Sequence, residues 1–170
     1  VLGYSKSEGM DITALIYKHN LPNEFYPETT KEAQDLSETD LSGEIVSRRD
    51  LTNENIFTID GKNAKDLDDA VCVKKTESGY KLTVSIADVS FYVKEGSLID
   101  KEAYERGTSV YFPDRAVPML PRALSENLCS LNPLEAKLTF SAEMDINETG
   151  KVLGADFYKS VIRSKARMLY

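Results

Sequence analysis

Residues 59–71 read IDGKNAKDLDDAV, a polar stretch set between two apolar runs at residues 55–59 and 70–73. The stretch contains four aspartates, which are Asp60, Asp66, Asp68 and Asp69. Both apolar runs are rich in β-branched and aromatic side chains, which is typical of strands. Two carboxylates about 4 Å apart repel by roughly 1 kcal/mol in water and about 4 kcal/mol in a partly buried site. A cluster anchored between two strands therefore needs something that offsets this repulsion.

Carboxylate oxygens are the ligands that Mg²⁺ or Mn²⁺ prefers, and magnesium is commonly held by a few carboxylates together with water and substrate phosphate. The cluster therefore suggests a metal-dependent site that acts on a phosphate ester. A solvated acidic turn explains the same residues and stays open at this point. A calcium loop is excluded, although Asp66, Asp68 and Glu77 have the spacing of ligand positions 1, 3 and 12. Such a loop needs a glycine where this chain has Val71.

The composition is that of an ordinary globular protein, with 170 residues, 41% apolar and 29% charged. No apolar run approaches the ~18–20 residues of a membrane-spanning helix, so no membrane association is expected. The net charge of −7 argues against a self-sufficient nucleic-acid binder, because Lys and Arg supply the sequence-independent affinity for phosphates. Cys72 and Cys129 lack metal-ligand spacing, which favours buried, reduced thiols and a cytoplasmic protein. The chain does not begin with Met, and we expect it to be a piece of a longer protein.

The rest of the chain predicts an α+β fold with a mixed, mainly antiparallel sheet and flanking helices. Helices are expected at residues 12–20, with Asp11 as N-cap, at residues 28–40 as a polar surface segment, and at residues 97–106 between Ser97 and Gly107. Strands are expected at residues 70–75 and 80–93, joined by a hairpin at 77–79, and at residues 137–146 and 151–163, joined by a second hairpin.

Three charged or titratable features lie outside the cluster. Asp88 interrupts an apolar run, so we expect it to bond backbone amides or a basic partner. Arg48 and Arg49 precede the cluster and have three possible roles, which are phosphate contact, balance of the carboxylates, or a solvated surface pair. His19, the only histidine, is interpreted as a helix-face residue and not as a ligand.

Several runs resemble the catalytic RNB domain of the RNase II and RNase R exoribonucleases, with RNase R the closer match. They cover most of residues 43–170 in the order that the family has. The runs are residues 58–61 (TIDG), 66–71 (DLDDAV), 86–90 (IADVS), 106–111 (RGTSVY), 118–121 (PMLP) with 124–125 (LS), 128–131 (LCSL) and 160–164 (SVIRS). Residues 1–42 are then the end of a cold-shock domain or a helical linker, and residues 43–170 the N-terminal half of an RNB domain.

The resemblance implies a hydrolytic and processive 3′→5′ exoribonuclease that uses Mg²⁺, with Mn²⁺ as the alternative ion, and releases 5′-nucleoside monophosphates. It maps the catalytic aspartates of the family onto the four aspartates of the cluster. It implies that Asp60, Asp66 and Asp69 hold metal, and that Asp68 is needed for chemistry more than for RNA binding. It also implies that Tyr111 stacks near the 3′ end of a single-stranded RNA; the alternative is that Tyr111 is a core strand residue.

The resemblance also sets limits on what this chain does by itself. The family commonly has histidines where this chain has Ser85 and Phe91. The downstream half of the RNB domain, the S1 domain and nearly all of the cold-shock domains are absent from these 170 residues. We therefore expect a monomer that is inactive or nearly so as an isolated piece. A catalytically silent RNA-binding module with the same fold is the alternative function.

Overall fold

The computed structural model describes residues 3–4 and 7–170, so residues 1–2 and 5–6 of the predicted segment 1–42 lie outside the described residues. The helices are α1 (Met10–Lys18), α2 (Pro27–Ser37), α3 (Ser42–Ser47), α4 (Val89–Tyr92), α5 (Leu98–Arg106) and the π-helix η1 (Ala123–Leu128). The strands are β1 (Arg49–Leu51), β2 (Thr58–Asp60), β3 (Asp69–Thr76), β4 (Gly79–Ala87), β5 (Val110–Tyr111), β6 (Ala116–Val117), β7 (Ala136–Asn147), β8 (Val152–Arg163) and β9 (Arg167–Leu169).

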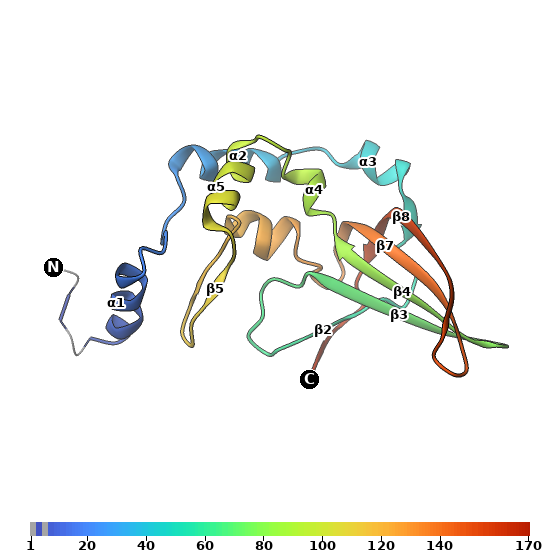
Figure 1. Cartoon of the computed structure of the whole chain (residues 1–170). Coiled ribbons are helices and arrows are strands. Elements are labelled where there is room, and N and C mark those ends of the chain that lie inside the picture. Colours follow the sequence, from blue (N-terminus) through green and yellow to red (C-terminus); the bar gives the residue numbers. More distant parts are fainter. Residues whose placement is uncertain (1–2, 5–6) are drawn as a thin grey trace.

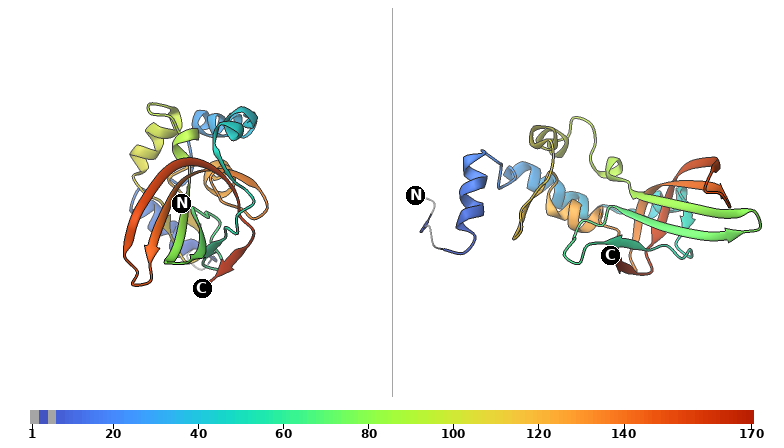
Figure 2. Two further views of the ribbon diagram at one scale, coloured as in Figure 1. Left: turned by 90° about the vertical axis from the view of Figure 1, so that its right-hand side faces the viewer. Right: turned by 60° about the horizontal axis from the view of Figure 1, so that its bottom comes forward.

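The main sheet has the strand order β1-β8-β7-β4-β3 (Figure 1). Neighbouring strands run antiparallel except β1 and β8, which are parallel. Two small sheets accompany it: β2 pairs with β9 in parallel, and β5 pairs with β6 as a hairpin. Helices gather at one end of the sheet, and the tips of the β3–β4 and β7–β8 hairpins project away from α1, α2 and α5 (Figures 1 and 2). The prediction of an α+β fold with a mainly antiparallel sheet is confirmed.

The two predicted hairpins are present because their turns have suitable residues. Gly79 has a φ of 145°, and a Cβ at this position would lie 2.1 Å from the carbonyl oxygen of Ile146 on β7. In the β7–β8 turn the side chain of Asn147 accepts hydrogen bonds from the backbone of Thr149 and of Lys151. The predicted helix start is confirmed as well, since Ser97 Oγ accepts from the Asp100 backbone N–H at 3.1 Å.

Three local predictions were wrong, each for a physical reason. The first helix begins at Met10 after a left-handed Gly9, so Asp11 lies inside the first turn and does not cap it. The helix expected at residues 28–40 is present as α2, but it is more than a surface segment, because its Ala33 is fully buried beside α5 and η1. The strand expected over residues 80–93 ends at Ala87, because Asp88 turns inward and α4 begins at the next residue.

The sheet has one face that is covered and rich in hydroxyl groups. Ser85, Thr139, Ser141 and Ser160 are fully buried there, and their hydroxyls are linked in a chain of 2.6–2.7 Å hydrogen bonds. Each hydroxyl can donate and accept, so such a chain satisfies buried polar atoms without a charge. The core cluster of Ile56, Leu67, Ile99, Leu131 and Ile162 lies between this part of the sheet and the helices.

Both cysteines are buried and free, as the sequence predicted. Burial raises the pKa of the Cys129 thiol to about 12, and also raises the pKa of Cys72 above its ordinary value. Both side chains therefore behave as small apolar groups and not as reactive thiolates. Across residues 3–4 and 7–170, no helix is both long enough and apolar enough to cross a membrane.

A buried ion pair joins the start of the sheet to its centre. Arg48 Nη2 donates to Asp88 Oδ2 at 2.7 Å, and both side chains are almost completely buried. Arg48 also donates to the carbonyl of Thr139 and to the carboxylate of Glu44, while Ser90 Oγ donates to Asp88. Burial alone would raise the pKa of Asp88, but the hydrogen bonds from Arg48 and Ser90 hold it below its ordinary value. Asp88 thus has the basic partner that was predicted, and Arg48 balances this carboxylate and not those of the acidic cluster.

We predict that Arg48→Met lowers the free energy of unfolding by about 3–5 kcal/mol at pH 7, because it leaves the Asp88 carboxylate buried without a counter-charge. The folded pKa of Asp88 is depressed, so the stabilising contribution of the pair is present above the ordinary value of about 4 and is lost as the pH falls through the folded value. The loss caused by the substitution should therefore shrink on acidification. Urea unfolding between pH 7 and pH 3 measures both effects.

The matched control is Lys31→Met, which breaks the exposed pair between Lys31 and Asp35. It should cost less than about 1 kcal/mol. A loss at Arg48 that equals the loss at Lys31, or that does not change with pH, would contradict the assignment.

Candidate active site

The acidic cluster lies on a loop that connects two strands and returns on itself. Asp60 ends β2, and Asp69 begins β3. Phe57 and Val71 exchange two backbone hydrogen bonds of 3.1 and 2.9 Å, so the two arms of the loop run antiparallel where they meet. Counting outward from this bridge, Asp60 and Asp68 have equivalent positions on the two arms. The segment that carries the four aspartates is therefore bent.

The segment after η1, residues 130–131, holds the loop from the side that faces the core. Ser130 Oγ accepts from the backbone N–H of Leu67 at 3.1 Å and donates to the carbonyl of Lys65 at 2.9 Å. The backbone N–H of Leu131 donates to the Leu67 carbonyl at 2.8 Å. Leu67 and Ser130 are fully buried. Because Leu67 points into the core, the aspartates on either side of it are turned outward.

The first part of the loop is held by the final strand. Arg167, on β9, donates from Nη2 to the carbonyls of Gly61 and Lys62 at 2.7 and 3.0 Å. Strand β9 also pairs with β2 along Thr58 to Asp60. Sequence reasoning missed both Arg167 and Ser130 as supports of the loop. Ser130 lies in one of the runs that resemble the RNB family, but nothing in its local sequence indicates a partner 63 residues away.

The four carboxylates lie close enough to influence one another. Asp68 remains accessible to solvent, yet the pKa of its carboxyl is raised above the ordinary value. Partial burial of the group is the largest cause, and repulsion from Asp66, Asp69 and Asp60 adds to it. The structure therefore brings all four predicted aspartates into one electrostatic site, which argues against a simple solvated turn.

The donor chemistry of the site fits a divalent cation. Asp60 Oδ2 is buried, and it has no hydrogen-bond partner among the residues that the structure describes. An unpaired buried carboxylate oxygen is costly unless a cation is bound beside it. Among these same residues, no three acidic, His or Cys side chains already form a complete metal-binding group. The carboxylate chemistry therefore suits magnesium, whereas the present spacing of these side chains does not form a finished site.

Tyr111 lies beside the cluster on the short β5–β6 hairpin. Its hydroxyl donates to Asp66 Oδ2 at 2.5 Å, and its side chain is not in the core, since the residue is 66% exposed. The hydrogen bond to Asp66 is the largest cause of the raised pKa of Tyr111. The alternative of a core strand residue is therefore wrong. The exposed ring is available to a ligand while its hydroxyl is fixed at the acidic site.

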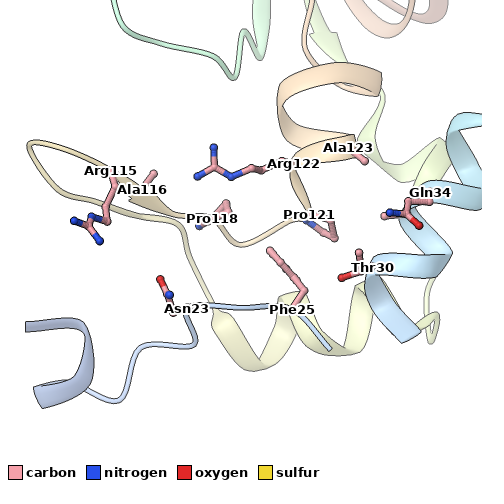
Figure 3. A pocket seen from close by; sticks show the side chains of 11 residues that line it. Asn23, Phe25, Thr30, Gln34, Arg115, Ala116, Pro118, Pro121, Arg122 and Ala123 are labelled. Atoms are coloured by element: carbon pink, nitrogen blue, oxygen red, sulfur yellow. The ribbon is translucent and has the colours of Figure 1, made fainter. Parts of the chain in front are cut away.

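The other charged residues considered from the sequence lie elsewhere. Arg49 is half-exposed and stacks over the ring of Tyr158 at 4.2 Å. His19 is exposed at the end of α1. A pocket of about 350 Å³ opens between α2 and the segment of residues 115–123 (Figure 3), and it is lined by none of the four aspartates. Its two arginines already have carboxylate partners, since Arg115 pairs with Asp114 and Arg122 with Glu126.

Comparison with known proteins adds independent evidence. The family model "RNB domain" matches residues 48–170. The whole chain is 50% identical to Ribonuclease R of Aquifex aeolicus, of which it covers 24%, and 41% identical to Ribonuclease R of Escherichia coli, of which it covers 21%. The chain thus spans about a quarter of the length of the curated relatives it matches.

Solved structures with the same fold include RNase R of Mycoplasma genitalium in complex with ribose-methylated single-stranded RNA. The two share 35% identity with a TM-score of 0.92, over all of this chain and 27% of the other. Yeast Ssd1, a pseudonuclease, has a TM-score of 0.80 at 23% identity, over 99% of this chain and 22% of that protein. At that identity the likeness extends to the fold alone.

We predict that Ser130→Ala lowers the free energy of unfolding by about 1–3 kcal/mol, because the buried N–H of Leu67 loses its acceptor. Hydrogen exchange of the Leu67 amide should accelerate, as the loop that carries Asp66 and Asp68 is released. Urea unfolding and exchange measured by NMR test the two statements. Ser47→Ala is the matched control, since it removes an exposed hydroxyl hydrogen bond to Glu44 and should change stability by less than about 0.5 kcal/mol. Equal effects of both substitutions would contradict the role of Ser130.

Proposed function

The chain belongs to the RNB domain family, and from this premise we propose that its acidic loop is the catalytic centre of a Mg²⁺-dependent, hydrolytic 3′→5′ exoribonuclease. The observation that carries the proposal is the returning loop, which gathers four carboxylates beside an exposed aromatic ring. The likeness to RNase R of M. genitalium, solved with single-stranded RNA, supports RNA as the substrate. Relatives named Ribonuclease R that match the whole chain support the same activity class.

We assign the metal ligands to Asp60, Asp66 and Asp69. The buried, unpartnered oxygen of Asp60 supports this assignment, as does the mutual repulsion of the carboxylates, which a cation would relieve. When bound, Mg²⁺ or Mn²⁺ supplies positive charge for the phosphate and promotes ionisation of water. The protein itself anchors the loop through Leu67, Ser130 and Arg167, so the backbone between the carboxylates is held in place before the ion binds.

Asp68 and Tyr111 have different proposed roles. Asp68 remains accessible to solvent at the site and acts in the chemical step more than in holding RNA. The ring of Tyr111 offers a sequence-tolerant surface on which a terminal base stacks. Its hydroxyl bond to Asp66 fixes the ring next to the carboxylates, so that a stacked terminal nucleotide has its phosphate near the site. Processive release of 5′-nucleoside monophosphates belongs to the same proposal.

The full-length protein is the unit to which this function applies. The chain spans about a quarter of its relatives and carries a net charge of −7, so other segments have to supply most of the attraction for RNA. We propose that the 170 residues alone are inactive or nearly so, and that the parent protein is a cytoplasmic monomer. The second candidate function is a catalytically silent RNA-binding module with the same fold. The observation that keeps this candidate under test is that no three of the described acidic, His or Cys side chains already form a metal-binding group.

We predict that Asp68→Asn in the full-length protein lowers the rate of RNA shortening by at least about 100-fold, since the substitution removes a carboxylate and preserves its size. Binding of RNA should change by less than about threefold. The measurement uses 5′-labelled single-stranded RNA with Mg²⁺, product ladders on a gel and an equilibrium binding titration. An exposed substitution on α2, Asp35→Asn, is the control and should retain full activity. If the wild-type protein binds RNA but never shortens it, the exoribonuclease proposal is wrong and the catalytically silent RNA-binding module takes its place.

We predict that Tyr111→Ala weakens RNA binding about 5- to 150-fold, which corresponds to the ~1–3 kcal/mol of one lost stacking contact, and changes the length of the shortest product. Tyr111→Phe keeps the ring but removes the hydrogen bond to Asp66, so it should retain most of the affinity. The same labelled RNA reports both quantities. Equal losses for the two variants would mean that the hydroxyl, and not the stacked ring, is what the site uses.

A further inference from the structure

The hairpin that carries Tyr111 is too small to hold its own position. Strands β5 and β6 have two residues each, and in the described part of the chain they pair only with each other. An isolated two-stranded hairpin is at best marginally stable in water. The hairpin projects from the end of α5 (Figure 1), and the bond from the Tyr111 hydroxyl to Asp66 holds only the far end of an exposed ring. Contacts at the base of the hairpin therefore have to set where the rest of the ring lies.

The two legs of the hairpin are tied together at this base. Arg106 is the last residue of α5, and residues 107–109 lead from it into β5. Its Nη1 donates to the carbonyl of Pro118, which directly follows β6, at 3.2 Å. Beside this bond, Ser109 Oγ accepts from the backbone N–H of Met119 at 2.9 Å. Arg106 thus spans the base from one leg to the other.

The same guanidinium is bonded to a segment far earlier in the chain. Nη1 also donates to the carbonyl of Pro22 at 2.8 Å, and Nη2 donates to the carbonyl of Glu24 at 2.5 Å. Nε and Nη2 both donate to Glu102 Oε1, at 3.1 and 2.7 Å. The ring of Phe25 lies against the flat face of the group, 3.6 Å from Cζ to the ring centroid. The side chain is 2% exposed and every N–H of the guanidinium has an acceptor, so Arg106 has none left for a phosphate.

The frame to which Arg106 ties the hairpin is itself fixed. The second oxygen of Glu102 accepts from the backbone N–H of Tyr26 at 3.2 Å, so the carboxylate holds the same early segment. At the other end of α5, Glu32 on α2 accepts from the backbone N–H of Ile99 at 2.8 Å. Helix α5 is therefore bonded at both of its ends to residues that precede the acidic loop in sequence.

We propose that Arg106 is a positioning residue for Tyr111. It fixes the base of the β5–β6 hairpin relative to residues 22–26, and so keeps the exposed ring beside the acidic loop. The proposal rests on the proposed function, in which this ring stacks on a terminal base of RNA. A pair that served stability alone would need only the Glu102 carboxylate, whereas here three carbonyls from two separate segments share one guanidinium. Because that group is planar and rigid, neither segment can shift without losing a bond.

The test is Arg106→Lys in the full-length protein, made both with Tyr111 present and in a Tyr111→Ala background. Lysine keeps the positive charge beside Glu102, but its three donors lie on one atom and it has no flat face, so it cannot reproduce the bonds and the stacking together. Arg48→Lys is the matched control, since Arg48 is equally buried and bonded to a buried carboxylate at 2.7 Å, but has no contact with the hairpin.

Affinity for single-stranded RNA is measured by equilibrium titration without divalent ions, so that no RNA is shortened, and the shortest product is then measured with Mg²⁺. Urea unfolding verifies that each variant is folded. If Arg106→Lys does not fold, Phe25→Ala takes its place in both backgrounds. That substitution removes the ring against the guanidinium and leaves every hydrogen-bonding group of Arg106 with its acceptor.

We expect Arg106→Lys to weaken RNA binding about 3- to 10-fold when the ring is present and less than about twofold when it is absent, because a positioning residue has no further effect once the group it positions is removed. The length of the shortest product should change as it does in Tyr111→Ala. Arg48→Lys should change the affinity less than about twofold in both backgrounds.

Three results would overturn the proposal. Equal losses in the two backgrounds would mean that Arg106 acts independently of the ring, and no loss in either would mean that the ring does not depend on it. An equal loss in Arg48→Lys would mean that the effect reflects stability alone. Tyr111→Ala by itself tests the role of the ring, and shortening of RNA by the wild-type protein tests the exoribonuclease, so either can fail separately from the comparison of the two backgrounds.

Discussion

Burial of Leu67 is the constraint on which the candidate site depends. Four like charges within ten residues would separate in a free loop, since each pair gains by moving apart. Here the leucine between them is inserted in the core, and both its backbone groups are bonded to the Ser130–Leu131 segment. Removing Leu67 from the core would expose its side chain and break those bonds. The apolar contact thus opposes the repulsion and holds Asp66 and Asp68 at the surface.

Distant parts of the chain hold this loop in place, and each does so from a different side. Ser130 acts from the segment after η1, Arg167 acts from β9, and Tyr111 acts from the β5–β6 hairpin. The sheet contributes through β3, which continues directly from Asp69. The acidic site therefore belongs to the fold as a whole, and it forms only when segments more than 40 residues apart in sequence have come together.

The parts of this structure that sequence reasoning predicted are those that depend on near neighbours. The aspartates, the turn at Gly79 and the capping Ser97 could be found because each acts within a few residues. The rest depends on contacts that no local pattern contains. Asp88 ends a strand that the apolar run appeared to continue, because its partner Arg48 lies 40 residues earlier and draws it into the core. Ser130 could not be predicted as a support of the loop for the same reason.

Strands fix the two outer aspartates of the cluster. Asp60 ends β2 and lies opposite Leu169 on β9. Asp69 begins β3 and lies opposite Ile86 on β4. The two inner aspartates, Asp66 and Asp68, are fixed instead by the burial of the leucine between them. Two different kinds of contact, strand pairing and insertion of an apolar side chain, therefore hold the four carboxylates against their mutual repulsion.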